Sequence, residues 1–259
     1  MEGANVITFS LMIFETAEFL GDYFKWAKAS FAPMLMSTGY FLGVERGVPI
    51  EDKLISRRRL SIGYYKDLES YLAHMATPEQ DAYYKDINTT WGGKFERSSS
   101  TYLVVRRLKG VQSIPINKGD IVDKDTYLKE FAEGSEPIVL LRGLGLNSDD
   151  WEKYDAWVKE WGYKIYIPLL LKIPGVIEYC RCWLSNVWRE GPVVKPGITI
   201  NTEYPQDLSI IYFENLKAYQ NFQKSKELEV YDKNLAAAFP GGLNYKWNNA
   251  FQLMVRFSK

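Results

Sequence analysis

Two stretches of the chain are near copies of each other and decide the fold: Leu60-Ser-Ile-Gly-Tyr-Tyr-Lys-Asp-Leu-Glu-Ser-Tyr71 and Leu208-Ser-Ile-Ile-Tyr-Phe-Glu-Asn-Leu-Lys-Ala-Tyr219. Each begins with a β-branched and aromatic run, which is typical of a strand, and continues into the start of a helix. Asp67 and Asn215 lie at this junction, and each has a side-chain oxygen that can accept the free N–H groups of a first helical turn. The chain therefore contains a duplication.

The residues around the first copy predict a unit of six elements. An apolar, β-prone run is followed by apolar residues at the three-to-four spacing of one helix face. Two strands, a second helix and a last strand complete the order β-α-β-β-α-β. The expected ranges are residues 6–14 for the first strand, 20–35 for the helix stripe, 40–46 and 60–66 for the middle strands, 67–90 for the second helix and 101–108 for the last strand.

The same order repeats in the second half of the chain. The stretch between the halves carries glycine, proline and charge, which is typical of a connector, and we expect one short helix in it at residues 127–131. The expected domains are residues 1–109 and 137–259, joined by the connector 110–136. The elements of the second unit are expected at residues 138–146, 151–165, 176–184, 208–213, 215–239 and 246–257.

A β-α-β-β-α-β unit whose helices both lie on one sheet face is the ferredoxin-like arrangement. Its other sheet face is bare, and a bare face with large apolar side chains must be covered. Two tandem copies cover each other when they pack sheet on sheet about a pseudo-two-fold axis. The expected fold class is therefore α+β, with two tandem ferredoxin-like repeats packed as an intramolecular barrel.

A short motif adds a family resemblance. The segment Trp161-Gly-Tyr-Lys-Ile-Tyr-Ile-Pro-Leu-Leu-Leu-Lys-Ile-Pro-Gly175 resembles the Trp-Tyr-x-x-x-His-Ile-Pro-Leu-Leu-x-x-x-Pro-Gly signature of EthD-like members of the dimeric α/β-barrel superfamily, and the first half keeps a worn version, Trp26-Ala-Lys-Ala-Ser-Phe-Ala-Pro-Met-Leu35. The resemblance implies two units around a central cavity. A weaker resemblance, through the repeat order and Gly63-Tyr-Tyr-Lys-Asp67, is to haem-dependent aldoxime dehydratases, whose second repeat supplies a proximal histidine that this sequence lacks.

The composition limits which partners and which cellular compartment we expect. Thirty-two basic residues balance thirty-two acidic ones among 259 residues, so no overall charge draws the chain to nucleic acid or to an anionic membrane. The N-terminus lacks the regions of a signal peptide, and no apolar run approaches the roughly 20 residues that span a bilayer. We expect a cytoplasmic protein without nucleic-acid or membrane partners, either a monomer with internal pseudo-two-fold symmetry or a homodimer.

Cys180 and Cys182, the only cysteines, are interpreted as buried apolar side chains.

His74 is the only histidine, and thus the only side chain whose ordinary pKa suits acid–base chemistry near neutral pH. It lies at the edge of an apolar helix stripe, and the aligned repeats place Phe222 at the same position. Because the equivalent position of the second repeat holds a phenylalanine, a packing role for His74 is favoured. Catalysis by the imidazole, or haem ligation, is the alternative.

Tyr166 and Arg142 are the other candidate catalytic residues beside His74. Tyr166 takes the place of the histidine that the resemblance implies, and its phenol can donate a hydrogen bond to a substrate oxygen although it is a poor base at neutral pH. Arg142 interrupts an apolar strand. Such a charge lies on an exposed edge or is paired inside, and inside it can anchor a carboxylate or enolate oxygen.

The strands supply candidate substrate-binding residues. Residues two apart on a strand share a face, so Ile62 and Tyr64 point one way. Ser61, Gly63 and Tyr65 point the other way, where the glycine or the serines can floor a cavity. Facing sheets rich in tyrosine and tryptophan suit a flat or polycyclic ligand. The candidates are Tyr64, Tyr65, Tyr179, Arg181, Tyr212, Phe213 and Trp247.

The sequence shows no phosphate loop, no Ser-His-Asp arrangement and no paired metal ligands, so no cofactor and no metal is expected. The resemblance implies a cofactor-independent enzyme of natural-product biosynthesis. We expect it to be a lyase or dehydratase, a cyclase or an isomerase, acting on an apolar, aromatic or polycyclic small molecule in the central cavity. The alternatives are a haem-dependent lyase of the aldoxime dehydratase type and a non-catalytic binding protein.

Overall fold

The computed structural model describes residues 3–51, 57–110, 127–131, 133–146, 151–185, 199–200, 204–240 and 243–259. The first repeat has the predicted order, with short π-helical turns (η) inside its first helical segment. Its elements are β1 (Val6–Phe14), α1 (Ala17–Trp26), η1 (Ala27–Phe31), α2 (Ala32–Ser37), β2 (Phe41–Pro49), β3 (Arg58–Tyr65), α3 (Leu68–Met75), α4 (Pro78–Trp91) and β4 (Phe95–Lys109).

The second repeat follows the same plan. Two short strands are additional to the β-α-β-β-α-β pattern: β5 (Tyr127–Glu130), between the repeats, pairs with the last strand of the chain, and β8 (Thr199–Ile200), between β7 and β9, pairs in parallel with β4. The elements of the second repeat are β6 (Ile138–Leu146), α5 (Trp151–Trp157), η2 (Val158–Tyr166), α6 (Ile167–Leu170), β7 (Val176–Leu184), β9 (Asp207–Phe213), α8 (Leu216–Gln223), α9 (Lys226–Ala238) and β10 (Leu243–Ser258).

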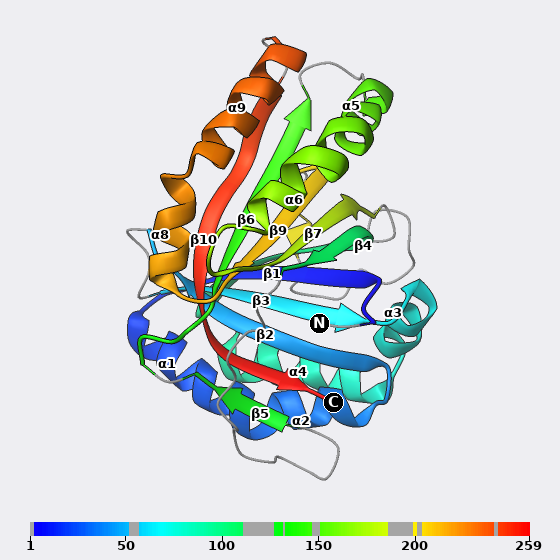
Figure 1. Cartoon of the computed structure of the whole chain (residues 1–259). Coiled ribbons are helices and arrows are strands. Elements are labelled where there is room, and N and C mark those ends of the chain that lie inside the picture. Colours follow the sequence, from blue (N-terminus) through cyan, green and yellow to red (C-terminus); the bar gives the residue numbers. More distant parts are fainter. Residues whose placement is uncertain are drawn as a thin grey trace.

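The strands of the two repeats close into one barrel (Figure 1). Eight of them follow the order β1-β3-β2-β10-β6-β9-β7-β4, and β4 pairs with β1 to complete the ring. All the pairs in the ring are antiparallel. The repeats meet along β2–β10 and β4–β7, so each half lends its edge strands to the other and the ring leaves no free sheet edge.

The duplicated junctions cap helices as the sequence predicts. The Ser70 backbone N–H donates to Asp67 Oδ1 at 2.8 Å, and the Ala218 N–H donates to Asn215 Oδ1 at 3.0 Å. These side chains satisfy donors that a first helical turn leaves free. The helices α3 and α8 therefore begin at equivalent places in the two repeats.

Two predictions about local structure were wrong. The helices expected over residues 67–90 and 215–239 are each broken in two. Pro78 lacks an N–H and disfavours helix in the residue before it, so α3 ends and Thr77 caps α4. Ser225 caps α9 in the same way. The helix expected at residues 127–131 is the strand β5, because β10 runs on past the end of β6 and its residues Val255–Ser258 pair with β5.

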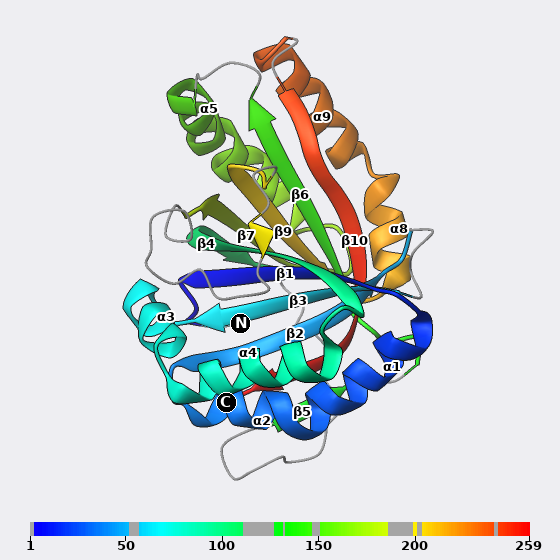
Figure 2. The same ribbon diagram turned by 180° about the vertical axis from the view of Figure 1, so that it is seen from behind.

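The helices lie on the outside of the barrel. Figures 1 and 2 show α1, α2 and α4 on the side of β1, β3 and β2, and α5, α6, α8 and α9 on the side of β6 and β9. Each repeat therefore has a layer between its sheet and its helices, besides the barrel interior that the two repeats share. Separate apolar cores fill these layers.

The pseudo-two-fold axis passes close to the twin residues Tyr64 and Tyr212, whose hydroxyls are in contact inside the barrel. Both hydroxyls also donate to Glu45 Oε2, at 2.5 and 2.9 Å, and Arg256 binds the other carboxylate oxygen. Burial by itself would raise the pKa of Glu45, but the Arg256 guanidinium outweighs it and holds that pKa below its usual value. A charged, fully bonded cluster thus joins the repeats.

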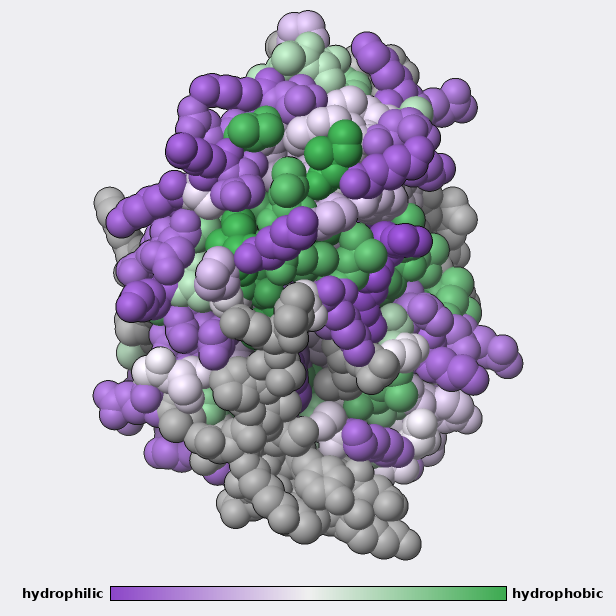
Figure 3. Space-filling view, viewed as in Figure 1, coloured by the Kyte–Doolittle hydropathy of each residue, from purple (hydrophilic) through white to green (hydrophobic). Residues whose placement is uncertain are grey.

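The outer surface carries apolar side chains on the second repeat. Figure 3 shows them gathered in the region of the helices of that repeat, between charged side chains. The exposed large apolar residues there are Ile165, Leu169, Leu216 and Val230. None of the helices that the structure describes is long and apolar enough to cross a membrane.

Candidate functional site

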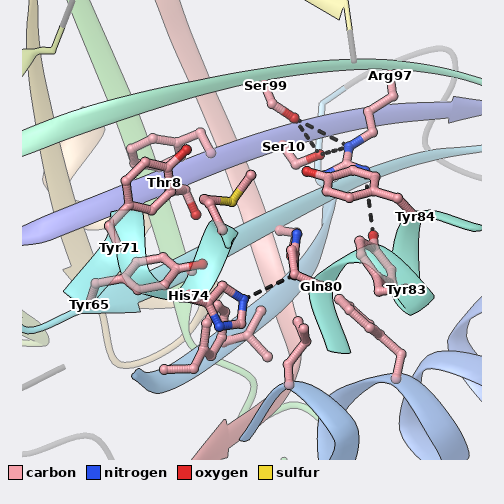
Figure 4. A pocket seen from close by; sticks show the side chains of 18 of the residues that line it. Thr8, Ser10, Tyr65, Tyr71, His74, Gln80, Tyr83, Tyr84, Arg97 and Ser99 are labelled. Carbon is pink, nitrogen blue, oxygen red and sulfur yellow. Dashed lines mark hydrogen bonds between the residues drawn. The ribbon is translucent and has the colours of Figure 1, made fainter. Parts of the chain in front are cut away.

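A pocket lies between the sheet of the first repeat and its helices α2, α3 and α4 (Figure 4). Its volume is about 60 Å³. This space suffices for a few water molecules and is smaller than the cavity of about 150 Å³ that takes benzene, so a ring-sized ligand requires the surrounding side chains to move. The polar lining residues are Thr8, Ser10, Arg59, Ser61, Tyr65, Tyr71, His74, Gln80, Tyr83, Tyr84, Arg97 and Ser99.

The pocket exists because this sheet face carries small side chains where the second repeat has large ones. The strand registers align Thr8 with Leu140 and Gly63 with Ile211. A Cβ at Gly63 would lie 2.5 Å from Thr8 Oγ1 and 3.2 Å from Phe41 Cζ, so a side chain does not fit there. In the second repeat the same layer is filled, since Leu140 and Ile211 belong to its packed core.

Arg97 supplies a fixed positive charge at one side of the pocket. Its Nε donates to Ser10 Oγ at 3.0 Å and to Ser99 Oγ at 3.3 Å, and its Nη1 donates to Tyr83 Oη at 3.5 Å (Figure 4). Burial by itself would lower the pKa of Arg97, but neighbouring tyrosines, Tyr83 first, outweigh it and raise that pKa. The floor of the pocket is thus a charged and hydroxyl-bearing surface, not an apolar one.

His74 lines the pocket with both ring nitrogens engaged. Nδ1 is 3.1 Å from Thr38 Oγ1, and Nε2 is 3.0 Å from Gln80 Oε1. The ring packs against Phe41 and Tyr65, at centroid distances of 5.1 and 5.4 Å. Burial lowers the pKa of His74 to about 4, so the imidazole is neutral at neutral pH and a weak base. These contacts favour the packing role that its alignment with Phe222 indicates.

We expect His74→Phe to flatten the acid side of the stability curve. The pKa of His74 is about 4 in the folded protein and about 6.5 when unfolded, so the unfolded state binds the proton more readily. The wild-type free energy of unfolding should therefore fall by about 3 kcal/mol between roughly pH 6.5 and pH 4 through this residue. The variant should lack this loss, although at pH 7 it gives up about 1–3 kcal/mol because Thr38 and Gln80 lose a partner.

Urea unfolding of both proteins across this pH range measures the difference. The turnover number of the variant should stay within about tenfold of the wild type. A hundredfold loss, about 2.7 kcal/mol of transition-state stabilisation, would contradict the packing role and restore His74 as a catalytic residue.

A haem does not fit the residues of this pocket. The macrocycle is far larger than a space of about 60 Å³, and the imidazole that would bind its iron has both nitrogens engaged by Thr38 and Gln80. Within the described part of the chain no three His, Cys, Asp or Glu side chains form a group that could hold a metal ion. We therefore assign no step to haem.

The pocket described above lies away from the barrel axis, where the sequence predicts a cavity. Tyr64, Tyr212 and Trp247, three of the candidate binding residues, belong to a packed apolar cluster that fills the interior. Trp247 packs edge-on against Phe9 at 6.4 Å. A barrel of eight strands has an interior that side chains can fill, and these aromatic rings are large enough to do so. The described pocket therefore lies on the outer face of the sheet.

Of the candidate residues the structure brings only Tyr65 and His74 to the pocket. Tyr166, Tyr179 and Phe213 are buried in the core between sheet and helices of the second repeat. Arg142 is paired there, with Asp232 Oδ1 at 2.9 Å. Arg181 is paired as well, with Asp155 and Asp207. The structure does not gather these residues into one site, and their roles toward a substrate stay predictions.

Tyr166 is stacked on Tyr231 with ring centroids 3.9 Å apart, and its buried hydroxyl has no hydrogen-bond partner among the described residues. We expect Tyr166→Phe to leave the rate unchanged if the substrate binds in the first repeat. Because the variant loses an unsatisfied polar group, its free energy of unfolding should rise by up to about 1 kcal/mol. Steady-state kinetics and urea unfolding measure both. A tenfold or larger loss of rate would move the catalytic site to the second repeat.

The sequence prediction missed Arg59, Arg97, Tyr83 and Tyr84. The signal for Arg59 is present in the aligned repeats, because Asp207 stands at the same position of the second copy. Thr8 and Ser10, at alternate positions of β1, signal a polar outer face, whereas the consecutive polar run at residues 98–101 of β4 does not distinguish the two faces. Tyr83 and Tyr84 carry no such signal, since aromatic residues on a helix more often pack in a core.

Neither a family model nor a curated protein matches this sequence. Solved structures match along nearly the whole chain. An anthrone oxidase-like protein has a TM-score of 0.60 at 10% identity, over 98% of this chain and 93% of that one. A candidate monooxygenase from Fusobacterium nucleatum subsp. nucleatum has a TM-score of 0.58 at 10% identity, over 100% and 96%. At identities this low, the structural matches show a shared fold alone. That fold is the one expected from the duplicated stretch.

Proposed function

We propose that this chain, a dimeric α/β barrel formed by one polypeptide, is an enzyme whose substrate binds in the pocket of the first repeat. The substrate is a small aromatic or polycyclic molecule that bears oxygen, and the reaction is that of a lyase, isomerase or cyclase. One observation carries the proposal: of two equivalent layers, one is filled, and the other keeps a pocket lined by two arginines, four tyrosines and a hydroxyl-bearing floor.

The pocket can stabilise negative charge on a substrate oxygen. Arg59 and Arg97 supply positive charge, and Tyr65, Tyr71 and Tyr84 supply phenol groups on the pocket wall. Donors and charges held in place in a site of low polarity favour a developing enolate or phenolate over the neutral substrate. The apolar part of the substrate would pack against Phe31, Leu35 and Met75.

The described lining contains no carboxylate, and His74 is a weak base. Proton removal would therefore rely on the acidity that the arginines induce in the bound substrate and on its positioning, with a water molecule in the pocket as the proton acceptor. Isomerisation, elimination and cyclisation can all start from the resulting anion. The names of two structural neighbours, a candidate monooxygenase and an anthrone oxidase-like protein, support a second fate, in which dioxygen oxidises the same anion.

The test begins with the purified protein. Aromatic and polycyclic compounds with an enolisable carbonyl or a phenol are screened for thermal stabilisation, and binders are then assayed for conversion by mass spectrometry under air and under argon. Conversion in both atmospheres supports a lyase, isomerase or cyclase, and conversion only in air supports oxidation. Binding without conversion would leave a binding protein, and a Soret band would restore the haem alternative.

A further inference from the structure

Two arginines of the first repeat are buried near the pocket, and no carboxylate among the residues that the structure describes is paired with either of them. Arg46 and Arg59 are 0% and 2% exposed. The three guanidinium nitrogens of Arg46, and Nε and Nη1 of Arg59, have no hydrogen-bond partner among the described residues. Buried charges are ordinarily paired and hydrogen-bonded, because their desolvation is costly. These two side chains therefore need an explanation.

The second repeat shows what a completed version of this layer contains. The registers Arg46↔Ser61 and Arg181↔Ser209 make Arg181 the twin of Arg46. Arg181 donates from Nε to Asp207 Oδ2 at 2.6 Å and from Nη1 to Asp155 Oδ1 at 2.9 Å. Although burial would lower the pKa of Arg181, Asp207 outweighs it and raises that pKa. The positive charge of Arg181 is thus neutralised by two carboxylates of the same repeat.

The first repeat lacks both partners. Asp207 is replaced by Arg59 in the aligned copies, and the alignment of Trp26 with Trp161 puts Leu20 in the place of Asp155. An ion pair in one repeat is therefore a pair of cations in the other. Burial, without a carboxylate to oppose it, lowers the pKa of Arg46 to about 10.

Aromatic rings hold the two guanidiniums in place. The Arg46 guanidinium lies over the rings of Phe31 and Phe257, at 4.8 and 5.4 Å, and that of Arg59 lies 4.2 Å from the ring centroid of Tyr23. Such contacts favour a cation without supplying a hydrogen-bond acceptor to the unpartnered nitrogens of Arg46 and Arg59. Arg59 and Phe31 line the pocket, whereas Arg46 lies over the Phe31 ring and lines a second pocket with Phe24 and Lys28. A ligand in the first pocket therefore meets Arg59 directly, and it reaches Arg46 only past the Phe31 ring.

We infer that Arg59, with Arg46 beside it, binds the carboxylate of the ligand, which takes the role that the Asp207 carboxylate has beside Arg181 in the second repeat, so that the substrate of this pocket is an organic acid. The inference rests on the proposed site but does not require turnover. A carboxylate is planar, accepts two N–H groups of one guanidinium and still presents lone pairs to a second. The apolar and phenolic walls suit an aromatic or unsaturated remainder.

The test measures binding of simple probes to the full chain by calorimetry. Benzoate or the smaller acetate should bind, and benzamide, the neutral analogue of benzoate, should bind at least tenfold more weakly than benzoate. Arg59→Gln should weaken carboxylate binding at least tenfold. Arg59→Asp should abolish it and raise the melting temperature of the ligand-free protein, because it recreates the ion pair of the second repeat. Lys85→Asp, an equal change of charge at an exposed position of α4, should bind like the wild type.

Several results would overturn the inference. One is no binding of either carboxylate, another is equal affinity in wild type and Arg59→Gln, and a third is binding of inorganic phosphate in place of both carboxylates. A fourth is tyrosinate absorbance at neutral pH that disappears in Tyr23→Phe, because an ionised Tyr23 would already neutralise the arginines. If carboxylates bind but no compound is converted, only the proposed enzyme activity would be contradicted. If instead the protein converts an uncharged substrate, and the Arg59→Gln variant converts it equally well, only this inference would be contradicted.

Discussion

Residues 1–112 expressed alone are not expected to give a stable monomer. The isolated half would expose Ile7, Phe9, Leu60, Ile62, Tyr64 and Tyr102, each at most 1% exposed in the whole chain. Burial of a large apolar side chain is worth about 1.5–3 kcal/mol, so six of them amount to roughly 9–18 kcal/mol, which is comparable to the stability of an entire domain. The half would also lose the strand pairs β2–β10 and β4–β7. Aggregation, or a homodimer that closes the barrel with a second copy, is the expected result.

Size-exclusion chromatography and urea unfolding of the fragment check this expectation. As a control, residues 1–112 and 127–259 produced together as separate chains should form a soluble complex, because each then covers the sheet of the other. A cooperatively unfolding monomer of residues 1–112 would contradict the intramolecular barrel.

Filling the pocket should abolish activity without unfolding the protein. Gly63→Ile gives the first repeat the residue of its twin, Ile211, but its Cβ would meet Thr8 Oγ1 at 2.5 Å. Adding Thr8→Ala removes that oxygen, so the double variant should fold while the isoleucine occupies the pocket. We expect a loss of at least a hundredfold in kcat/KM, about 2.7 kcal/mol.

The single variant Gly63→Ile should lose about 1–3 kcal/mol of stability through overpacking, and the double variant should regain most of it. Gly21→Ala is the matched control. A Cβ at Gly21 meets nothing within 4 Å, so alanine in α1 should keep full activity and gain up to about 1 kcal/mol of stability. Full activity of the double variant would show that the substrate binds elsewhere.

Much of the fold could be predicted because its evidence is local and repeated. The stretch from Leu60 to Tyr71 has a strand pattern and a helix cap that recur in the second half, and two independent copies of one signal support each other. The break between α3 and α4 could also have been predicted, because Pro78 lies inside the expected helix and proline interrupts helices. The strand β5 could not be predicted, because a four-residue strand depends on the part of β10 that extends past β6, which is distant in sequence.

The site could be predicted only in part. Alternation along β3 correctly assigned Ser61, Gly63 and Tyr65 to one face, and the pocket lies on that face. What the alternation could not decide was which face keeps empty space. The barrel interior is closed because Tyr64, Tyr212 and Trp247 meet there from three strands, and such a meeting depends on register and closure.

The sequence by itself determined the duplication, the order of the elements, the helix starts at Asp67 and Asn215, and the need for each half to cover the other, since these follow from local propensity and from apolar surface that must be buried. Only the tertiary structure decided which residues are partners. It paired Arg181 with Asp207 and left Arg46 beside Arg59. Both arrangements arise from strands with the same pattern, and a charge becomes a structural ion pair or a binding group only through what packing brings within hydrogen-bonding distance of it.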